Sequence, residues 1–304
     1  MKKALLIGLA ALCLLSLAGM AQAKISDQAG NYGYKFLTVP YGPVSVALAN
    51  RGVHSADNAM AFIYQPAAAC ENDQRIISLS HSPWLVDTTA NCLAYSYGRK
   101  TSHFGIALRN LDYGEIENRD DSGYLIGYYS PLDMDIIANY AYRLSPSVYF
   151  GVNAGVLYQK LDTATSLGLH SDFGLSLLPP LKGGKLSIAA RNLGNANQTN
   201  QETVRFPSSL EADYTQQFAL GEQQLSLGVA ALKMSDADLK GSISAELDLA
   251  NILQIRAGYK VNYDAEGLSA GFGVHYRRFG IDYGFADFTR ELTDVHSFGL
   301  SYRF

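Results

Sequence analysis

Apolar and polar residues alternate with a period of two along most of the chain. From 253 to 261, Leu, Ile, Ala, Tyr and Val occupy one set of alternate positions, and Gln, Arg, Gly and Lys occupy the other. Such alternation predicts a β-strand with one apolar and one polar face. The pattern recurs in fourteen segments, 74–80, 91–98, 102–110, 134–143, 147–159, 163–177, 184–193, 208–216, 221–233, 241–249, 253–261, 268–276, 279–286 and 298–304. The chain is therefore predicted to be all-β.

Two all-β architectures present this alternation, a soluble sandwich and a transmembrane antiparallel up-and-down barrel. The apolar faces continue for about five alternate positions, which fits the roughly 9 to 11 residues that a tilted strand needs to cross a bilayer. Tyrosines near strand ends would form aromatic girdles at the membrane interfaces, at Tyr142, Tyr158, Tyr259, Tyr276 and Tyr302. The pattern favours a barrel of about 14 strands over residues 74–304, with the sandwich as the alternative.

The first residues predict export. Lys2 and Lys3 precede an apolar run over 4–20, and Ala21-Gln22-Ala23 reads as a small-residue cleavage site. Residues 1–23 are thus predicted to be a cleaved signal peptide, and a retained membrane helix is the alternative. With the barrel, this predicts an integral protein of the bacterial outer membrane that contacts its lipid.

The last strand carries a predicted assembly signal. Apolar residues stand at alternate positions and the sequence ends on an aromatic residue, with Phe298, Leu300, Tyr302 and Phe304 on one face. This is the form of C-terminal strand that the barrel-assembly machinery of outer membranes reads. We therefore expect that machinery to be a partner.

Two cysteines follow the signal segment, Cys70 and Cys92. An even pair in a protein exported to an oxidising compartment predicts a disulfide. Two buried thiols are the alternative.

Composition excludes several functions. The formal net charge is -4 and no basic stripe is interleaved with aromatic residues, so nucleic acid is not an expected partner. The histidines lack the spacing of a zinc site, and no particular Ser-His-Asp combination stands out along the chain. We expect no metal, no cofactor and no enzyme activity.

Residues 24–73 do not alternate, and here the chain resembles the PorV/PorQ family of the FadL superfamily. Residues 56–69 read ADNAMAFIYQPAAA, similar to the family's A-D-D-A-x-A-x-x-x-N-P-A-G segment, although Gln65 and Ala68 stand where Asn and Gly are usual. Further similarities are carried by 190–194, 206–210, 255–259, 267–273 and 281–285. The resemblance implies that 24–73 folds as a hatch inside a fourteen-stranded barrel, with Asp57, Asn58, Tyr64, Gln65 and Pro66 as hatch residues.

The resemblance implies two functions. A PorV-like protein binds exported proteins in a type IX-like secretion pathway and hands them on, so secreted cargo would be its partner. The alternative is a FadL-like passive transporter, which takes hydrophobic small molecules through the hatch and releases them by a lateral opening in the wall.

Turning the polar faces inward places charges of both signs in the lumen. An unpaired charge in a confined, partly dry space is costly, so these residues are expected to pair and to hold the plug. Guidance of a ligand is the alternative role. The predicted network consists of Arg109, Asp133, Asp135, Arg143, Asp172, Arg191, Glu246, Arg256 and Asp282.

Overall fold

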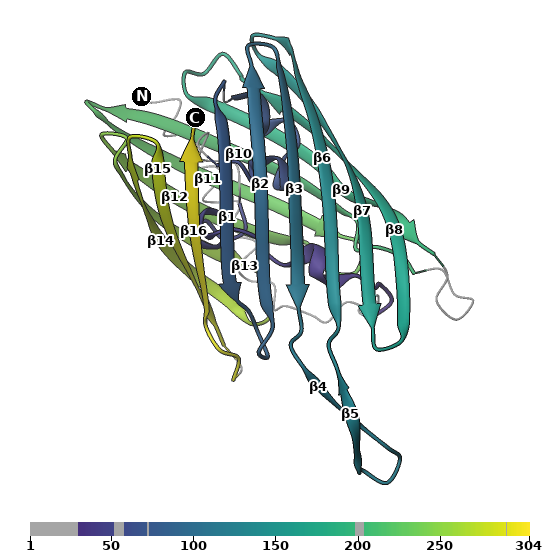
Figure 1. Cartoon of the computed structure of the whole chain (residues 1–304). Coiled ribbons are helices and arrows are strands. Elements are labelled where there is room, and N and C mark those ends of the chain that lie inside the picture. Colours follow the sequence, from purple (N-terminus) through teal and green to yellow (C-terminus); the bar gives the residue numbers. More distant parts are fainter. Residues whose placement is uncertain (1–29, 52–57, 72, 198–203, 290) are drawn as a thin grey trace.

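The computed structural model describes residues 30–51, 58–71, 73–197, 204–289 and 291–304. Fourteen antiparallel strands close into a barrel in which each strand pairs with its neighbour along the chain and β1 also pairs with β16 (Figure 1). The predicted fold is confirmed. The barrel strands are β1 (Arg75–Pro83), β2 (Thr89–Arg99), β3 (Ser102–Asp112), β6 (Leu132–Ser145), β7 (Val148–Leu161), β8 (Ala164–Leu177), β9 (Gly184–Ala196), β10 (Ser209–Leu220), β11 (Gln223–Met234), β12 (Lys240–Leu249), β13 (Leu253–Val261), β14 (Glu266–Tyr276), β15 (Phe279–Phe288) and β16 (Val295–Arg303).

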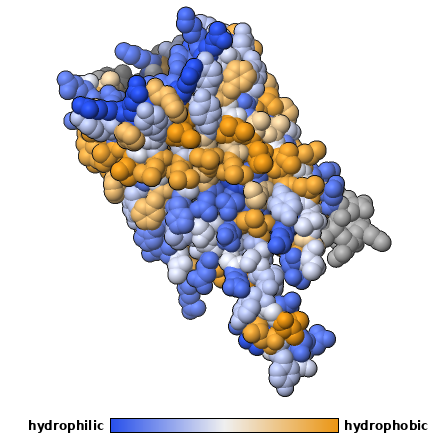
Figure 2. Space-filling model, viewed as in Figure 1, coloured by the Kyte–Doolittle hydropathy of each residue, from blue (hydrophilic) through white to orange (hydrophobic). Residues whose placement is uncertain are grey.

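The alternating pattern separates the two faces of the wall. On β1, Ile76, Ser78 and Ser80 are buried toward the interior, whereas Ile77 and Leu79 are exposed on the outside. Figure 2 shows the outward apolar residues as a continuous band around the visible face of the barrel, with polar residues above and below it. This band has the form of a membrane-facing surface. Within the part of the chain that the structure describes, no helix is long and apolar enough to cross a membrane.

The two ends of the barrel differ in their connections. Two-residue turns follow Arg99, Ser145, Leu220 and Tyr276 at one end, whereas the longest connections, 113–131 and 197–208, lie at the other, which also has a two-residue turn after Leu161. The last strand ends on the short-turn side, where the Phe304 amide donates to the Arg75 carbonyl. In outer-membrane barrels short turns face the periplasm and long loops face outward.

A small hairpin between β3 and β6 was not predicted. β4 (Ile116–Arg119) and β5 (Leu125–Tyr129) pair only with each other and project from the long-loop end (Figure 1). The two strands are too short to produce a recognisable alternating pattern. The hairpin could therefore be identified only from the structure.

The N-terminal segment fills the barrel as a plug. It comprises η1 (Lys35–Thr38), α2 (Pro43–Ala47), α3 (Ala61–Tyr64) and η2 (Ala68–Glu71) with the described chain between them. Helix α2 packs against β13 to β16, and η2 packs against β2, β3, β6 and β7. The main apolar core is shared between plug residues such as Phe36 and Phe62 and wall residues such as Ile76 and Ile137. Plug and wall are thus one packed unit.

Candidate functional site: the plug and the wall it seals

Wall side chains hold the plug by its backbone. Asn153 donates to the Phe62 carbonyl at 2.9 Å, and Asn139 donates to the Pro66 carbonyl at 3.1 Å. On the opposite wall, Ser269 donates to the carbonyl of Ala47 at 3.0 Å. A plug made of short helical turns leaves many carbonyls without backbone partners, and buried carbonyls need donors. The amides and hydroxyls on the inner wall meet this requirement.

Four of the five predicted hatch residues lie in the described plug, and Asp57 lies outside the described residues. Asn58 accepts a hydrogen bond from the Met60 amide, which fixes the entry to α3. The Tyr64 hydroxyl bonds both the amide and the carbonyl of Tyr41 at 2.6 Å. Burial raises the pKa of Tyr64 to about 12, so this hydroxyl remains a donor to the carbonyl even in alkaline solution. It joins the two halves of the plug.

Gln65 and Pro66 bring the plug backbone against the wall. Gln65 donates to the carbonyls of Leu175 and Ile188 at 3.3 and 3.1 Å, and its own oxygen faces the Ala67 amide. A side chain at Gly151 would collide with the Pro66 carbonyl, so this close approach requires glycine. The glutamine that replaces the family's asparagine thus reaches two wall strands, β8 and β9, in this structure.

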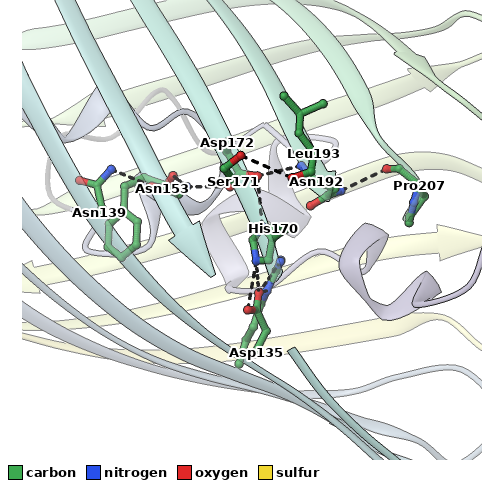
Figure 3. A network of polar contacts seen from close by, with 11 residues as sticks. Asp135, Asn139, Asn153, His170, Ser171, Asp172, Asn192, Leu193 and Pro207 are labelled. Atoms are coloured by element: carbon green, nitrogen blue, oxygen red, sulfur yellow. Dashed lines mark hydrogen bonds and ion pairs between the residues drawn. The ribbon is translucent and has the colours of Figure 1, made fainter. Parts of the chain in front are cut away.

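One cluster of buried charges lies on β3, β6 and β8 (Figure 3). Arg109 pairs with Asp135 at 2.9 Å, and His170 lies 3.1 Å from Asp135 and 3.3 Å from Asp172. Asp172 also accepts from Asn153 at 2.9 Å and from the Asn192 amide at 2.7 Å. Because Asn153 also donates to the plug backbone, this cluster joins the wall charges to the plug.

A second cluster lies on β12 to β15. Arg256 pairs with Glu246 at 2.7 Å and with Asp282 at 2.6 Å, and His275 lies 3.1 Å from Asp282. All four side chains are buried. A guanidinium between two carboxylates satisfies both negative charges away from water.

The remaining predicted lumen residues stand apart from both clusters. Asp133 accepts from Tyr113 and Gln159, each at 2.7 Å. Arg143 donates to the Cys70 carbonyl at 2.9 Å, and Arg191 pairs with Glu211 at 2.7 Å. The nine residues therefore lie on the inner side of the wall but do not form the single network that we predicted. The cluster on β12 to β15 lies on another part of the wall from the cluster on β3, β6 and β8. Asp133 and Arg143 share β6 with Asp135, and Arg191 lies on β9, next to β8, but each bonds a different partner.

One plug anchor was missed by the sequence analysis. Arg51 is 1% exposed and pairs with the buried Asp213 of β10. It also donates to Ser244 at 2.7 Å. Its position in the sequence could have pointed to it, because residues 36–50 contain no charged side chain and Arg51 follows them directly. Such an arginine in the predicted hatch was a candidate for the lumen charges.

The predicted disulfide is wrong, because Cys70 and Cys92 do not form a bridge in the structure. Cys92 is level with Arg109 and Asp135 in the strand register, whereas the Cys70 carbonyl is bound by Arg143. Asp135 and Arg143 are separated along β6 by about 26 Å, at about 3.3 Å per residue. The two thiols thus lie at different depths of the barrel, and a disulfide needs Cα atoms within about 7 Å.

A cavity of about 50 Å³ remains between the plug and the wall. Thr38, Pro40 and Arg51 border it from the plug, Arg191 borders it from the wall, and Tyr263 borders it from the β13–β14 connection. Cavities that bind benzene in proteins measure about 150 Å³. The plug therefore leaves too little room here for an aromatic molecule unless it moves.

Two hollows face each other across the wall at β1, β15 and β16. The outer hollow, of about 540 Å³, is bordered by outward aromatic and aliphatic side chains that include Phe272, Tyr283 and Phe298. The inner hollow, of about 20 Å³, is bordered by the plug residues Gly42, Pro43, Val44, Asn58 and Met60. Both share the wall residues Leu79, Asp282, Gly299 and Leu300. A single layer of wall separates the plug from the outside here.

Glycine makes this part of the wall thin. A side chain at Gly284 would collide with the Pro43 carbonyl, and a Cβ at Gly299 would lie 2.7 Å from the Pro43 ring. Pro43 therefore sits directly on the backbone of β15 and β16. This contact positions the start of α2 against the wall.

The predicted assembly residues lie on the outside of β16. Phe298, Leu300 and Phe304 are exposed, and the Tyr302 ring contacts the rings of Phe279 and Phe304. Their recognition by the assembly machinery stays a prediction.

Phe304→Asp is expected to reduce the amount of folded protein in the outer membrane about tenfold, since it removes an apolar contact and puts a charge on the lipid face. The measurement is the heat-sensitive migration of the barrel in outer-membrane fractions. Val86→Asp, at an exposed site in the β1–β2 connection, is the control. Normal folding of Phe304→Asp would contradict the predicted signal.

No protein-family profile and no curated protein matches the chain. Several solved structures do match it. The CymD monoaromatic hydrocarbon channel aligns with 14% identity and a TM-score of 0.62, covering 86% of this chain and 97% of that one. The Pseudomonas putida toluene transporter TodX aligns with 12% identity and a TM-score of 0.61, covering 86% and 98%. A Pseudomonas aeruginosa FadL homologue aligns with 10% identity and a TM-score of 0.60, covering 88% and 98%. At these identities the likeness concerns architecture, and the chain therefore has the fold of FadL-type outer-membrane channels.

Proposed function

We propose that the protein is a passive outer-membrane channel for small hydrophobic molecules, with the plug in its closed position. The observation that carries this proposal is the pair of hollows that share Leu79, Gly299 and Leu300. The names of the similar structures, a hydrocarbon channel and a toluene transporter, favour transport over the PorV/PorQ-like handling of secreted proteins. That secretion role stays a prediction.

The outer hollow suits the exit of an apolar molecule. Leu79, Ile281 and Leu300 border it, and in a membrane-spanning barrel it opens onto lipid. A hydrophobic molecule that left the lumen here would pass into the bilayer without crossing water, so it would avoid the cost of exposing apolar surface.

Passage needs movement of both the plug and the wall. The inner hollow of about 20 Å³ is too small for an aromatic ring, so the segment around Pro43 and Met60 must withdraw. The β1–β16 seam must also separate locally, because Leu79 and Leu300 are direct partners in the strand register. Locking this seam should therefore stop transport.

The test is a reversible cross-link in the variant Leu79→Cys/Leu300→Cys. Cα atoms of directly paired antiparallel residues are about 4.5 to 5.5 Å apart, which is within the range of a disulfide. We expect toluene uptake by cells that lack other channels for it to fall about tenfold after oxidation and to recover after reduction, since the bond holds the seam closed.

The matched control is Leu93→Cys/Leu108→Cys, which joins an equivalent outward pair on β2 and β3. Oxidation should leave its uptake unchanged. Equal uptake by the oxidised seam variant and the control would disprove exit at β1–β16. If the unmodified protein gave no uptake above that of cells without it, the transport function itself would be wrong.

A further inference from the structure

Local hydrogen bonds shape the turn of the β4–β5 hairpin, and no other element of the described chain makes an extensive contact with it. The Asp120 carboxylate accepts from the amides of Ser122 and Tyr124 at 2.9 and 2.8 Å, and Arg119 donates to the Gly123 carbonyl at 2.8 Å. The tip is thus a fixed turn. An isolated two-stranded hairpin is otherwise only marginally stable in water, so a structured tip presents its strands in a defined geometry.

This hairpin exposes large apolar side chains away from the membrane-facing band. Tyr124, Ile126 and Tyr128 are 73%, 63% and 57% exposed, and Leu125 is also exposed. Figure 2 shows an apolar patch on the projecting tip, separated from the main band by polar residues. A contiguous apolar patch on a projecting element indicates a binding surface.

Charge and backbone geometry define what fits this surface. Residues 112–131 contain five carboxylates, on Asp112, Glu115, Glu117, Asp120 and Asp121, and a single guanidinium, on Arg119. Each hairpin strand pairs only with the other within the described part of the chain, so its outer edge presents backbone donors and acceptors. Such an edge accepts an added strand. The acidic flanks select one with positive charges.

We propose that the β4–β5 hairpin is a docking surface for a basic, extended segment of a partner protein. The segment adds as a strand to the edge of the hairpin, its apolar side chains cover Ile126 and Tyr128, and its lysines or arginines face the carboxylates. A second copy of this chain fits poorly because it would bring acidic hairpins together. The same charge disfavours an anionic membrane surface.

The probe is a fluorescein-labelled peptide of alternating lysine and valine, and the receptor is the full-length protein in nanodiscs. Fluorescence anisotropy measures the Kd. The variant Glu115→Lys/Asp121→Lys leaves the turn-forming Asp120 intact and should raise the Kd at least about tenfold, because it reverses two flanking charges. Ile126→Ser/Tyr128→Ser should weaken binding similarly by removing apolar contact.

The control is Asp238→Lys, which changes an exposed carboxylate on another connection at the same end and should leave the Kd within about twofold. A peptide with alternate N-methylated amides should bind at least about tenfold more weakly, since it cannot form the strand hydrogen bonds.

Three results would overturn the proposal. The first is unchanged peptide binding after replacement of residues 115–129 by Gly-Ser-Gly. The second is equal binding of the N-methylated peptide, which would exclude strand addition. The third is hairpin-dependent self-association, or hairpin-dependent binding of phosphatidylglycerol vesicles, without peptide binding. In that case the occupant would be another copy or a membrane.

Discussion

Deleting residues 26–66, with the signal segment and its cleavage site kept, is expected to raise single-channel conductance in planar bilayers about tenfold or more. The described plug fills the lumen of a barrel whose wall contributes small inward residues at several positions, among them Gly151, Gly284 and Gly299. Fourteen strands enclose more space than such side chains fill, so water and ions would replace the plug.

Correct insertion must be shown for both forms by heat-sensitive migration. Replacement of residues 115–129 by Gly-Ser-Gly is the control deletion, because the hairpin projects from the barrel end and its loss should leave conductance unchanged (Figure 1). Equal conductance of intact and plug-deleted barrels would contradict the sealing role of the segment.

The substitution Arg51→Met is expected to open the plug on the wall of β10 to β12. It leaves the Asp213 carboxylate buried without its guanidinium partner, and breaking a buried pair in this way costs about 3–5 kcal/mol. If that cost falls on the docked state alone, the undocked fraction rises by about two orders of magnitude or more. The measurement is the fraction of time in open states in single-channel recordings.

A double variant separates the ion pair from other contributions. Arg51→Met/Asp213→Leu removes both charges and should return most of the closed time, because an apolar pair avoids the desolvated carboxylate. Arg119→Met removes a guanidinium from an exposed ion pair with Glu117 and serves as the matched control, expected to have no effect on opening. Equal opening in the single and double variants would show that the ion pair does not hold the plug.

The barrel could be predicted from sequence because its strands are long and one-sided. In segments such as 253–261, each outward residue is apolar and each inward residue is Gly or polar, and β13 covers the same range in the structure. The predicted bounds were less accurate for the segments 74–80 and 91–98, which correspond to the longer strands β1 and β2 in the structure. Errors of a few residues in the bounds leave the period of two recognisable, because every strand of a membrane-spanning barrel has one side that faces lipid.

The site was less accessible to sequence analysis because contacts in the lumen join distant strands. Asp135 meets His170 across β7, and Arg51 meets Asp213 of β10, 162 positions later in the chain. The false pairing of Cys70 with Cys92 came from the number of cysteines alone, since Cys70 lies in the segment 24–73 that does not alternate. For wall residues, alternation gives the face of each residue and not its depth. Depth depends on strand register, which the structure supplies.

The plug leads directly into the wall, since η2 ends at Glu71 and β1 begins at Arg75. A plug that leaves its seat is therefore still tethered to the barrel. Its effective concentration at the seat is that of a group on a short linker, in the millimolar range. Reclosure is then a unimolecular event that does not depend on protein concentration, whereas a plug peptide supplied separately would have to reach comparable concentrations to close a plug-deleted barrel.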